Sequence, residues 1–432
     1  MIHSRGSVKL GDVCHFMIGP FGSAYDTSNY VEKSDYRYIR GQDVKPFFLT
    51  DSESRFMTEQ DFIRLQKYAL QEDDLLVSVV GTLGNACIIY KDELPAIFSC
   101  KSTAIRANVI NAYFLLAYLN SKYGRELLLR KERGAIQMGL NLDDLRSLDI
   151  PQFTDSFYSH IEVLIKSAHD KISEANGAYH DTEQSLLSEL GFASWTPTEE
   201  SVSVKNCSDF MSAGRFDAEY FQLKYDEIVA KIKTYSGGTI KAASVLITGL
   251  VNESEDTPER YVELADIGVS GEIEGCTNAM FGELPSRARQ RMATGQVIAS
   301  SIEGSLDRCA LVTPEYDKAL CSTGFHRFCS QDINPETMLL LFKSWPIQQL
   351  MKRGCSGTIL CGILPAALEH VDLPVVNPDV QKVLAAKVRE SFALRAESKR
   401  LLDLAKHAVE VAIEQEEEKA MEALEKEIGH AN

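Results

Sequence analysis

Side chains able to make paired hydrogen bonds are concentrated in residues 36–44, YRYIRGQDV. Apolar and polar residues alternate there, which predicts a half-buried strand with Arg37, Arg40 and Gln42 on its outward face. Arginine and glutamine can each make two hydrogen bonds in one plane, which is the chemistry that reads base edges in a major groove. A row of solvated strand side chains without a ligand is the alternative interpretation.

Two other groups of polar residues have a similar character. Thr82 and Asn85 follow the buried-type run DLLVSVV, where small residues allow another backbone to approach closely, although a plain turn explains them equally well. Arg287, Arg289 and Arg291 occupy alternate positions, which predicts that they lie on one side of a strand or extended loop. Such a row suits contacts with phosphates and base edges.

No motif in the chain predicts catalysis. The phosphate-binding glycine patterns, HExxH and Gly-x-Ser-x-Gly are absent, and the histidines are scattered. A base-flipping adenine methyltransferase needs an Asn/Asp-Pro-Pro-aromatic loop, and the nearest string, Asn377-Pro-Asp, is better explained as a helix start. The cysteines form no CxxC pair and are typical of reduced thiols. We expect a protein without a catalytic site, metal or cofactor.

The candidate residues lie in two halves of the chain that repeat each other. Residues 134–151, GAIQMGLNLDDLRSLDIP, have a degenerate counterpart at 357–374, GTILCGILPAALEHVDLP, with numbers that differ by 223. The same offset pairs three further motifs: Tyr38-Ile39 with Tyr261-Val262, Asp43-Val44 with Asp266-Ile267, and Gly81-Thr82-Leu83 with Gly304-Ser305-Leu306. A constant offset over so long a stretch indicates a duplication, each half being a globular domain followed by a helix.

Each repeat ends in a proline, Pro151 or Pro374, that precedes a long helical pattern. The first helix, about 54 Å long if it runs from Asp155, has apolar residues spaced alternately by four and three, which predicts a seam for a partner helix. Its members are Ile161, Ile165, Ala168, Ile172, Ala175, Tyr179, Thr182 and Leu186, and the second helix has Val380, Leu384, Val388, Leu401, Leu404, Ala408 and Val411. The two helices are expected to pair antiparallel.

Other segments give simpler expectations. Residues 111–133 predict one helix with an apolar face, and residues 191–214 predict a polar linker. The acidic tail after Glu414 has lost the apolar seam, so we expect it to be a solvated or frayed helical end.

The net charge of −17 argues against a nucleic-acid ligand at first sight. The first 150 residues are close to neutral, however, and the excess acid lies further along the chain. Global charge does not rule out a local basic face, and a basic partner can supply phosphate neutralisation. The N-terminus has no apolar leader and no run approaches the roughly 20 apolar residues of a membrane span, so we expect a cytoplasmic protein without a membrane partner.

The repeated segments, taken in the order in which they occur along the chain, resemble the specificity (S) subunits of type I restriction-modification enzymes. YIRGQDV, DLLVSVVGTLGN and RFDAEYF carry the resemblance, which covers essentially the whole chain. It implies a non-catalytic protein with two target-recognition domains, each reading one half of a split double-stranded DNA target. The paired helices would fix the gap, two methyltransferase (M) subunits would dock, and a restriction (R) subunit would join. The second repeat departs from the first, with Leu360 in place of Gln137.

The resemblance implies an α+β fold, with two pseudo-repeated globular α/β target-recognition domains separated by two long antiparallel, coiled-coil helices. The expected divisions are recognition domains at 1–152 and 236–375, helical spacers at 153–192 and 376–432, and a linker with a helix at 193–235. Candidate base-edge contacts are Arg40, Gln42, Arg289 and Arg308, and candidate phosphate anchors are Lys101, Arg106 and Arg287. The complete set of candidate DNA contacts is Arg37, Arg40, Gln42, Thr82, Asn85, Lys101, Arg106, Arg287, Arg289, Arg291 and Arg308.

Two alternatives remain open from the sequence. The same architecture could direct another methyltransferase-based phage-defence system, or the chain could be an acidic coiled-coil scaffold that binds only proteins. A basic face on the domains would favour DNA.

Overall fold

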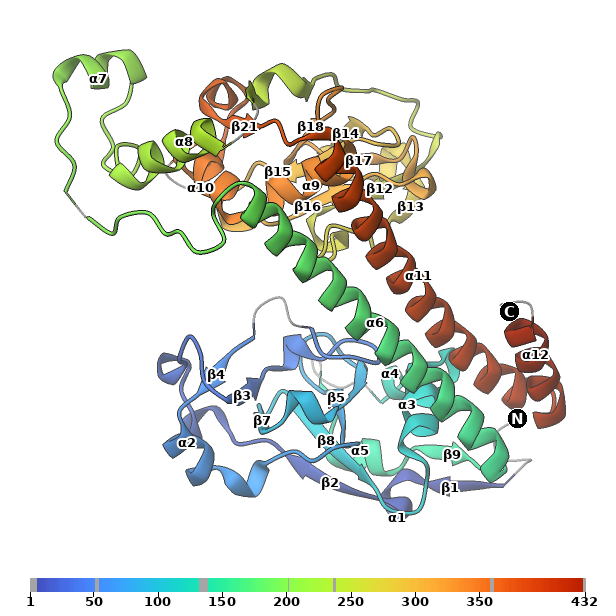
Figure 1. The fold of residues 1–432 in the computed structure, drawn as a ribbon. Coiled ribbons are helices and arrows are strands. Elements are labelled where there is room, and N and C mark those ends of the chain that lie inside the picture. The colour runs from blue at the N-terminus through green and yellow to red at the C-terminus, as the bar shows by residue number, and fades with distance from the viewer. Residues whose placement is uncertain are drawn as a thin grey trace. The chain divides into compact units, whose positions relative to one another are not determined.

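A computed structural model describes residues 6–50, 54–131, 139–200, 202–235, 238–357 and 361–429 (Figure 1). The chain forms two compact units, the first made of Met1–Ile172 with Ala396–Asn432 and the second of Ser173–Arg395. The division falls inside two long helices, α6 (Asp155–Glu189) and α11 (Pro378–Glu414). Each helix therefore contributes one of its halves to each unit.

The described part of the first unit is built around two main sheets. The larger one is antiparallel, in the order β2 (Cys14–Ile18), β8 (Ser102–Ala107), β5 (Leu75–Ser78) and β6 (Ala86–Ile88). The smaller one has the order β4 (Phe56–Met57), β3 (Tyr36–Ile39) and β7 (Ala96–Phe98), with β3 and β7 parallel. Strand β5 is buried at all four positions, as its continuous apolar sequence predicts for the centre of a covered sheet.

The second unit has the same topology. Its antiparallel sheet has the order β11 (Leu246–Ile247), β18 (Phe325–Phe328), β15 (Val297–Ser300) and β16 (Cys309–Leu311). Its other sheet has the order β13 (Thr277–Met280), β12 (Pro258–Val262), β17 (Leu320–Ser322) and β14 (Ala288–Arg291), with β12 and β17 parallel. Strand β14 has no counterpart strand among the described residues of the first unit, where the 3-10 turn Gln66–Tyr68 occupies the corresponding part of the sequence.

The strand registers repeat with the offset found in the sequence. Tyr38 lies opposite Ile97 in the parallel pair of the first unit, and Tyr261 lies opposite Leu320 in that of the second. Further along, the Leu140 amide donates to the Val79 carbonyl (3.0 Å), and the Ile363 amide donates to the carbonyl of Ser301 (2.8 Å), an acceptor one residue short of the offset. The expected α+β fold with an internal repeat is thus confirmed, although Gln137 and Leu360 lie outside the described residues.

The helix expected at 111–133 is two helices, α3 (Ala112–Asn120) and α4 (Lys122–Leu129). Ser121 interrupts it, because its hydroxyl donates to the Tyr118 carbonyl (2.6 Å) and accepts from the Gly124 amide (3.3 Å). The second unit repeats the break between α9 (Pro335–Lys343) and α10 (Trp345–Gly354). Residues 132 and 133 of the expected helix lie outside the described residues.

The predicted seam of α6 is buried except at Ile172, which is half-buried, and it packs against α11 within both units. Ile161, Ile165 and Ala168 belong to the core of the first unit together with Ala405 and Ala412 of α11. In the second unit the core includes Tyr179 and Leu186 of α6 and Leu384 and Val388 of α11. Each recognition domain expected from the sequence therefore shares its core with the paired helices.

Two buried serines fill the gap in the seam that the sequence left between Val388 and Leu401. In the second unit the Ser391 hydroxyl donates to the Ala175 carbonyl (2.8 Å), and in the first unit the Ser398 hydroxyl donates to the Ala168 carbonyl (2.7 Å). Small side chains on both helices let the two backbones approach closely enough for these bonds. The apolar pattern could not show them because serine is not an apolar residue.

The expectation of a solvated tail after Glu414 was wrong. Residues 417–429 form α12 (Glu417–Gly429), whose Ala420 and Leu424 are buried in the core of the first unit. The hydroxyl of Thr154 also bonds to Glu417. Acidic residues dominate the sequence of α12, but an apolar stripe on one face is enough to dock it.

The remaining elements complete the two units. The first unit adds β1 (Ser7–Lys9), which pairs with β9 (Asp149–Pro151), and the helices α1 (Leu10–Val13), α2 (Glu59–Arg64) and α5 (Leu142–Arg146). The second adds α7 (Cys207–Ala213), α8 (Leu223–Tyr235), β10 (Thr239–Lys241) paired with β21 (Asp372–Pro374), and β19 (Cys355–Ser356) paired with β20 (Gly362–Ile363). The segment expected as a linker therefore contains a short helix, α7.

Candidate nucleic-acid interface

Four loops of the first unit meet at one end of its sheets. β2 and β5 run antiparallel to β8, so their C-terminal ends lie beside the start of β8, where Ile18 pairs with Thr103 and Ser78 with Ser102. β3 and β7 are parallel and end together at Ile39 and Phe98. We call these four loops rim 1, defined as residues 19–22, 40–43, 79–82 and 99–101.

Close backbone contacts hold the loops of rim 1 together. A Cβ atom at Gly19 would lie 2.6 Å from the Ser99 carbonyl carbon, and one at Gly41 would lie 2.6 Å from the Cβ of Lys101. The Val79 amide donates to the Lys101 carbonyl (2.9 Å). Glycine is needed at both positions because any side chain there would push the loops apart.

Three of the sequence-predicted contact residues are exposed on rim 1: Gln42, Thr82 and Lys101. Within the described part of the chain, no hydrogen bond or ion pair engages the Lys101 ammonium or the Gln42 amide. An ammonium suits a phosphate, and a glutamine amide can pair with an adenine edge. Rim 1 therefore presents exposed side chains of types that can contact phosphates and base edges.

The two predicted arginines nearest to rim 1 are engaged inside the domain. The Arg40 guanidinium makes a two-pronged ion pair with Asp43, with its shortest contact at 2.7 Å, and Asp43 is only 2% exposed. The Arg37 guanidinium donates to the Thr50 carbonyl (3.0 Å). A base contact by either arginine would have to replace these bonds.

Arg106 lies away from rim 1, at the opposite end of β8. Its guanidinium pairs with both oxygens of Asp74, each at 2.7 Å, and Asp74 is 1% exposed and precedes the first residue of β5. The structure therefore does not bring Arg106 together with Gln42 and Lys101.

The second unit has the same loops at the same strand ends. We call residues 248–251, 263–266, 301–305 and 322–324 rim 2. Arg287 belongs to this end, because its guanidinium donates to the Glu263 carboxylate (2.9 Å) and to the Tyr261 hydroxyl (3.2 Å), and its side chain is 58% exposed. The hydrogen bonds to Tyr261 and Glu263 raise the pKa of Arg287. Arg287 remains accessible to a phosphate on its solvent side.

Charge differs between the two rims at matching positions. Counting along the offset of 223, Glu263 stands where rim 1 has Arg40, and Gly324 stands where rim 1 has Lys101. Rim 2 also contains Glu303, and the neighbouring Asp307 side chain is 63% exposed. Rim 2 is consequently the more acidic surface.

Arg289 and Arg291 do not form a common row with Arg287. A register shift between Ala288 and Gln290 interrupts the pairing of β14 with β17 and breaks the alternation of side chains. The Arg289 guanidinium lies over the Phe281 ring, 4.3 Å from its centroid. The predicted arginine row is thus divided among three different environments.

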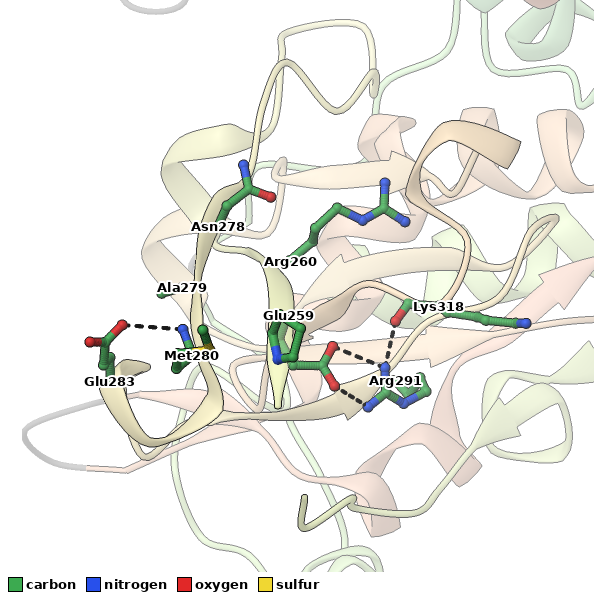
Figure 2. A pocket seen from close by; sticks show the side chains of 9 residues that line it. Glu259, Arg260, Asn278, Ala279, Met280, Glu283, Arg291 and Lys318 are labelled. Carbon is green, nitrogen blue, oxygen red and sulfur yellow. Dashed lines mark hydrogen bonds and ion pairs between the residues drawn. The ribbon is translucent and has the colours of Figure 1, made fainter. Parts of the chain in front are cut away.

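Arg291 points away from rim 2 into an open pocket of about 610 Å³ (Figure 2). Its guanidinium makes two bonds to Glu259 (2.6 and 3.1 Å) and donates to the Lys318 carbonyl (2.7 Å). Glu253 accepts a further bond at 2.9 Å. With two carboxylates on one guanidinium, Arg291 has little positive charge left for an anionic ligand.

Asn85 and Arg308 make equivalent side-chain hydrogen bonds in the two units. The Asn85 amide donates to the Val44 carbonyl (3.1 Å), and the Arg308 guanidinium donates to the Ile267 carbonyl (2.8 Å). Both pairs of residues are related by the offset of 223. Each side chain ties the turn after the central strand to the loop after the parallel strand, which gives both residues a bracing role.

Sequence reasoning missed one exposed apolar side chain on each rim. Phe21 is 72% exposed on rim 1 and Leu250 is 70% exposed on rim 2. Phe21 lies in the string Gly19-Pro-Phe-Gly22, whose glycines are typical of a tight turn. A large apolar residue held between two turn-forming glycines was the signal that could have identified Phe21.

Residues 6–152 match the model of the family described as the type I restriction modification DNA specificity domain. This range contains both sheets of the first unit and all of rim 1. This part of the chain is thus a type I restriction-modification specificity domain, and the resemblance noted in the sequence is confirmed.

Solved structures similar to the chain have low sequence identity. The S subunit of the type I restriction-modification system from M. genitalium is 11% identical, covering 97% of this chain and 95% of that chain, with a TM-score of 0.40. The HsdS subunit from Thermoanaerobacter tengcongensis is 13% identical, covering 95% and 97%, with a TM-score of 0.30. A structure concerning assembly of the type I R-M system is 13% identical, covering 95% and 98%, with a TM-score of 0.29. No curated protein matches the chain in sequence.

Two kinds of site are absent from the part of the chain that the structure describes. None of the helices there is both long enough and apolar enough to cross a membrane. No group of three or more His, Cys, Asp or Glu side chains in this part of the chain is arranged to hold a metal ion.

Proposed function

We propose that this protein is the specificity subunit of a type I restriction-modification system. Residues 1–152 and 236–375 are its two target-recognition domains, and each reads one half of a bipartite double-stranded DNA target. Residues 153–192 and 376–432 are helical spacers, and residues 193–235 link the halves. The protein itself is non-catalytic, and the M subunits that it positions transfer the methyl group.

The repeated rim is the observation that carries the proposal. Four loops occur at the same strand ends in both units, in the same order and with matching bonds between them. Rim 1 lies within residues 6–152, which match the family model of a DNA specificity domain. Two equivalent surfaces on one chain suit a target that has two separate parts.

Rim 1 contains the best-placed contacts. We propose Gln42 as a reader of base edges, with Lys101 and Thr82 at the DNA backbone. Arg287 is the corresponding phosphate contact of rim 2. Arg37, Arg40, Asn85 and Arg308 support the shape of the rims, since their side chains bond within their own domains.

The paired helices set the distance between the two half-sites. Helices of 35 and 37 residues are about 52 and 55 Å long. Half-sites about one duplex turn apart, roughly 34–36 Å, are within the reach of such helices. Two M subunits and, in the complete complex, an R subunit are the proposed protein partners.

Methylome sequencing tests the function directly. A host that expresses this chain with its M subunits should acquire one new bipartite methylated motif, which disappears when this gene alone is deleted. A continuous motif, or no new motif, would contradict the proposal. Identification of the co-purified partner then distinguishes a type I system from another methyltransferase-based defence system.

The acidic surface of rim 2 favours one competing function, a scaffold that binds only proteins. Glu263 and Glu303 would repel a phosphate backbone, and the chain has a net charge of −17. The scaffold predicts that the complex with M subunits binds all duplexes equally or none. If the chain is a specificity subunit, its complex with M subunits should prefer duplexes that contain the methylated motif at every salt concentration.

A further inference from the structure

Phe21 is held in an exposed position by the turn that contains it. The Phe21 backbone is extended (φ −62°, ψ 154°), and its carbonyl accepts a bond from the Ala24 amide (2.7 Å). Two residues earlier, Gly19 lies against Ser99, the first residue of the loop that carries Lys101. The ring is therefore presented at the end of β2 on the same rim as Lys101, with 72% of its surface exposed.

Leu250 occupies the matching loop of the second unit. The pairing of Phe16 with Ile105 and of Leu246 with Phe328 aligns the ends of β2 and β11, which makes Gly249 the counterpart of Gly19. The Gly249 carbonyl accepts a bond from Arg327 (3.0 Å), and the Val251 amide donates to the Arg289 carbonyl (2.8 Å). Both neighbours of Leu250 are thus fixed, while its own side chain is 70% exposed.

A single exposed apolar side chain on a protein surface needs no explanation. These two occur at the same strand end of both units, on the loops that the proposed function assigns to DNA. Phe21 also shares its rim with an ammonium and a glutamine amide, which together match a surface of phosphates and base edges. In proteins that bend DNA from the minor groove, exposed apolar side chains wedge between base steps and partly unstack them.

We propose that Phe21 and Leu250 are the apolar DNA contacts of the two domains, each packing against a base step of its own half-site. The inference rests on the proposed function and adds the residues that deform the target. Flexible pyrimidine–purine steps unstack most easily, so such a step is expected where each side chain contacts the duplex. The aromatic ring of Phe21 offers a larger stacking surface than Leu250 does.

The test uses the full chain in complex with its M subunits and a duplex that contains the motif found by methylome sequencing. 2-Aminopurine replaces one adenine in each half-site in turn, because its fluorescence rises when it unstacks. The variants are Phe21→Ala and Leu250→Ala. Val109→Ala and Met280→Ala are matched controls, since these exposed apolar residues (82% and 45%) lie just after β8 and at the end of β13, at the opposite strand ends from the rims.

Phe21→Ala should weaken specific binding by about 5- to 150-fold, the range for loss of one aromatic–base contact, and abolish the fluorescence rise in one half-site only. Leu250→Ala should abolish the rise in the other half-site, and the controls should change neither. Thermal unfolding of each variant should match the parent, because the replaced side chains are exposed.

Three results would overturn the inference in distinguishable ways. Unchanged affinity and fluorescence for Phe21→Ala, with specific binding by the parent complex, would remove the wedge and leave the proposed function intact. Loss of M-subunit association in Phe21→Ala would assign the side chain to a protein interface. Failure of the parent complex to discriminate between duplexes would remove the proposed function and this inference with it.

Discussion

Replacing Arg40 with alanine separates bracing of rim 1 from base reading. In the structure Arg40 pairs with Asp43, whose side chain is almost completely buried. The variant leaves that carboxylate without its cation. We therefore expect the main effect on stability and only a secondary effect on the choice of DNA sequence.

The magnitude follows from the contacts that remain. Removing one partner of a buried ion pair costs about 3–5 kcal/mol. Asp43 keeps the hydrogen bond from the backbone amide of residue 40 (2.8 Å), which alanine also provides, and the Arg40 side chain is 16% exposed so that water can replace part of it. The expected loss in free energy of unfolding is accordingly about 2–3 kcal/mol, below the full range for a buried pair.

Two measurements check this expectation. Urea unfolding should show an earlier transition for the first unit, and hydrogen exchange should accelerate in residues 40–50, where the Thr50 amide bonds to the Asp43 carbonyl (2.9 Å). Adding Asp43→Asn should recover part of the loss, with a coupling of about 1–3 kcal/mol between the two positions. Gln42→Ala is the matched control, and this exposed residue should change stability by less than about 0.5 kcal/mol.

The opposite pattern would refute the bracing role. If Arg40→Ala unfolds at the same urea concentration as the parent while one base pair of the methylated motif becomes degenerate, Arg40 reads that base. A true base reader would cost about 1–3 kcal/mol in binding and relax one position.

Four other outcomes are expected. Lys101→Ala should make the plot of log binding constant against log salt concentration less steep by about 0.9, as loss of one phosphate contact requires, without changing the recognised base sequence. An unchanged slope would exclude this phosphate contact. Ser391→Ala should destabilise the second unit by about 1 kcal/mol because its buried bond to the Ala175 carbonyl is lost, which urea unfolding can measure. Deleting one heptad from both α6 and α11 should shorten the gap in the methylated motif, and the same gap in the variant would exclude a spacer role. Burial against Tyr90 lowers the pKa of His169, so the unfolded chain binds a proton at this residue more readily than the folded chain does. The stability that neutral His169 contributes should therefore decline as the pH falls below about 6.5. In His169→Gln this part of the pH dependence of unfolding should be absent.

The repeat could be predicted because it is a property of order along the chain. Strand registers, helix starts and the segments that end each repeat all depend on short motifs. The offset between Tyr38 and Tyr261 therefore also appears in the strand pairing, where these two residues occupy equivalent positions. The α6 seam was readable for the same reason, since its spacing is local.

The use of individual side chains could not be predicted in the same way. Arg106 and Asp74 are far apart in the sequence and meet only because β5 and β8 are neighbours. The displacement of Arg289 depends on a bulge that has no sequence signature here. The loss of the apolar seam in an acidic segment suggested a solvated α12, although Ala420 and Leu424 are sufficient to bury one of its faces.

The unequal charge of the two rims gives the proposed target a direction. Lys101 has only a glycine, Gly324, at the matching position, and Arg287, the proposed phosphate contact of rim 2, is paired with Glu263. The first half-site would therefore be held more strongly through its backbone than the second. Exchanging the order of the half-sites within one duplex would then not produce an equivalent ligand. Changing the base sequence of the first half-site should abolish binding of the duplex. Changing the second should leave a duplex that is bound but poorly positioned.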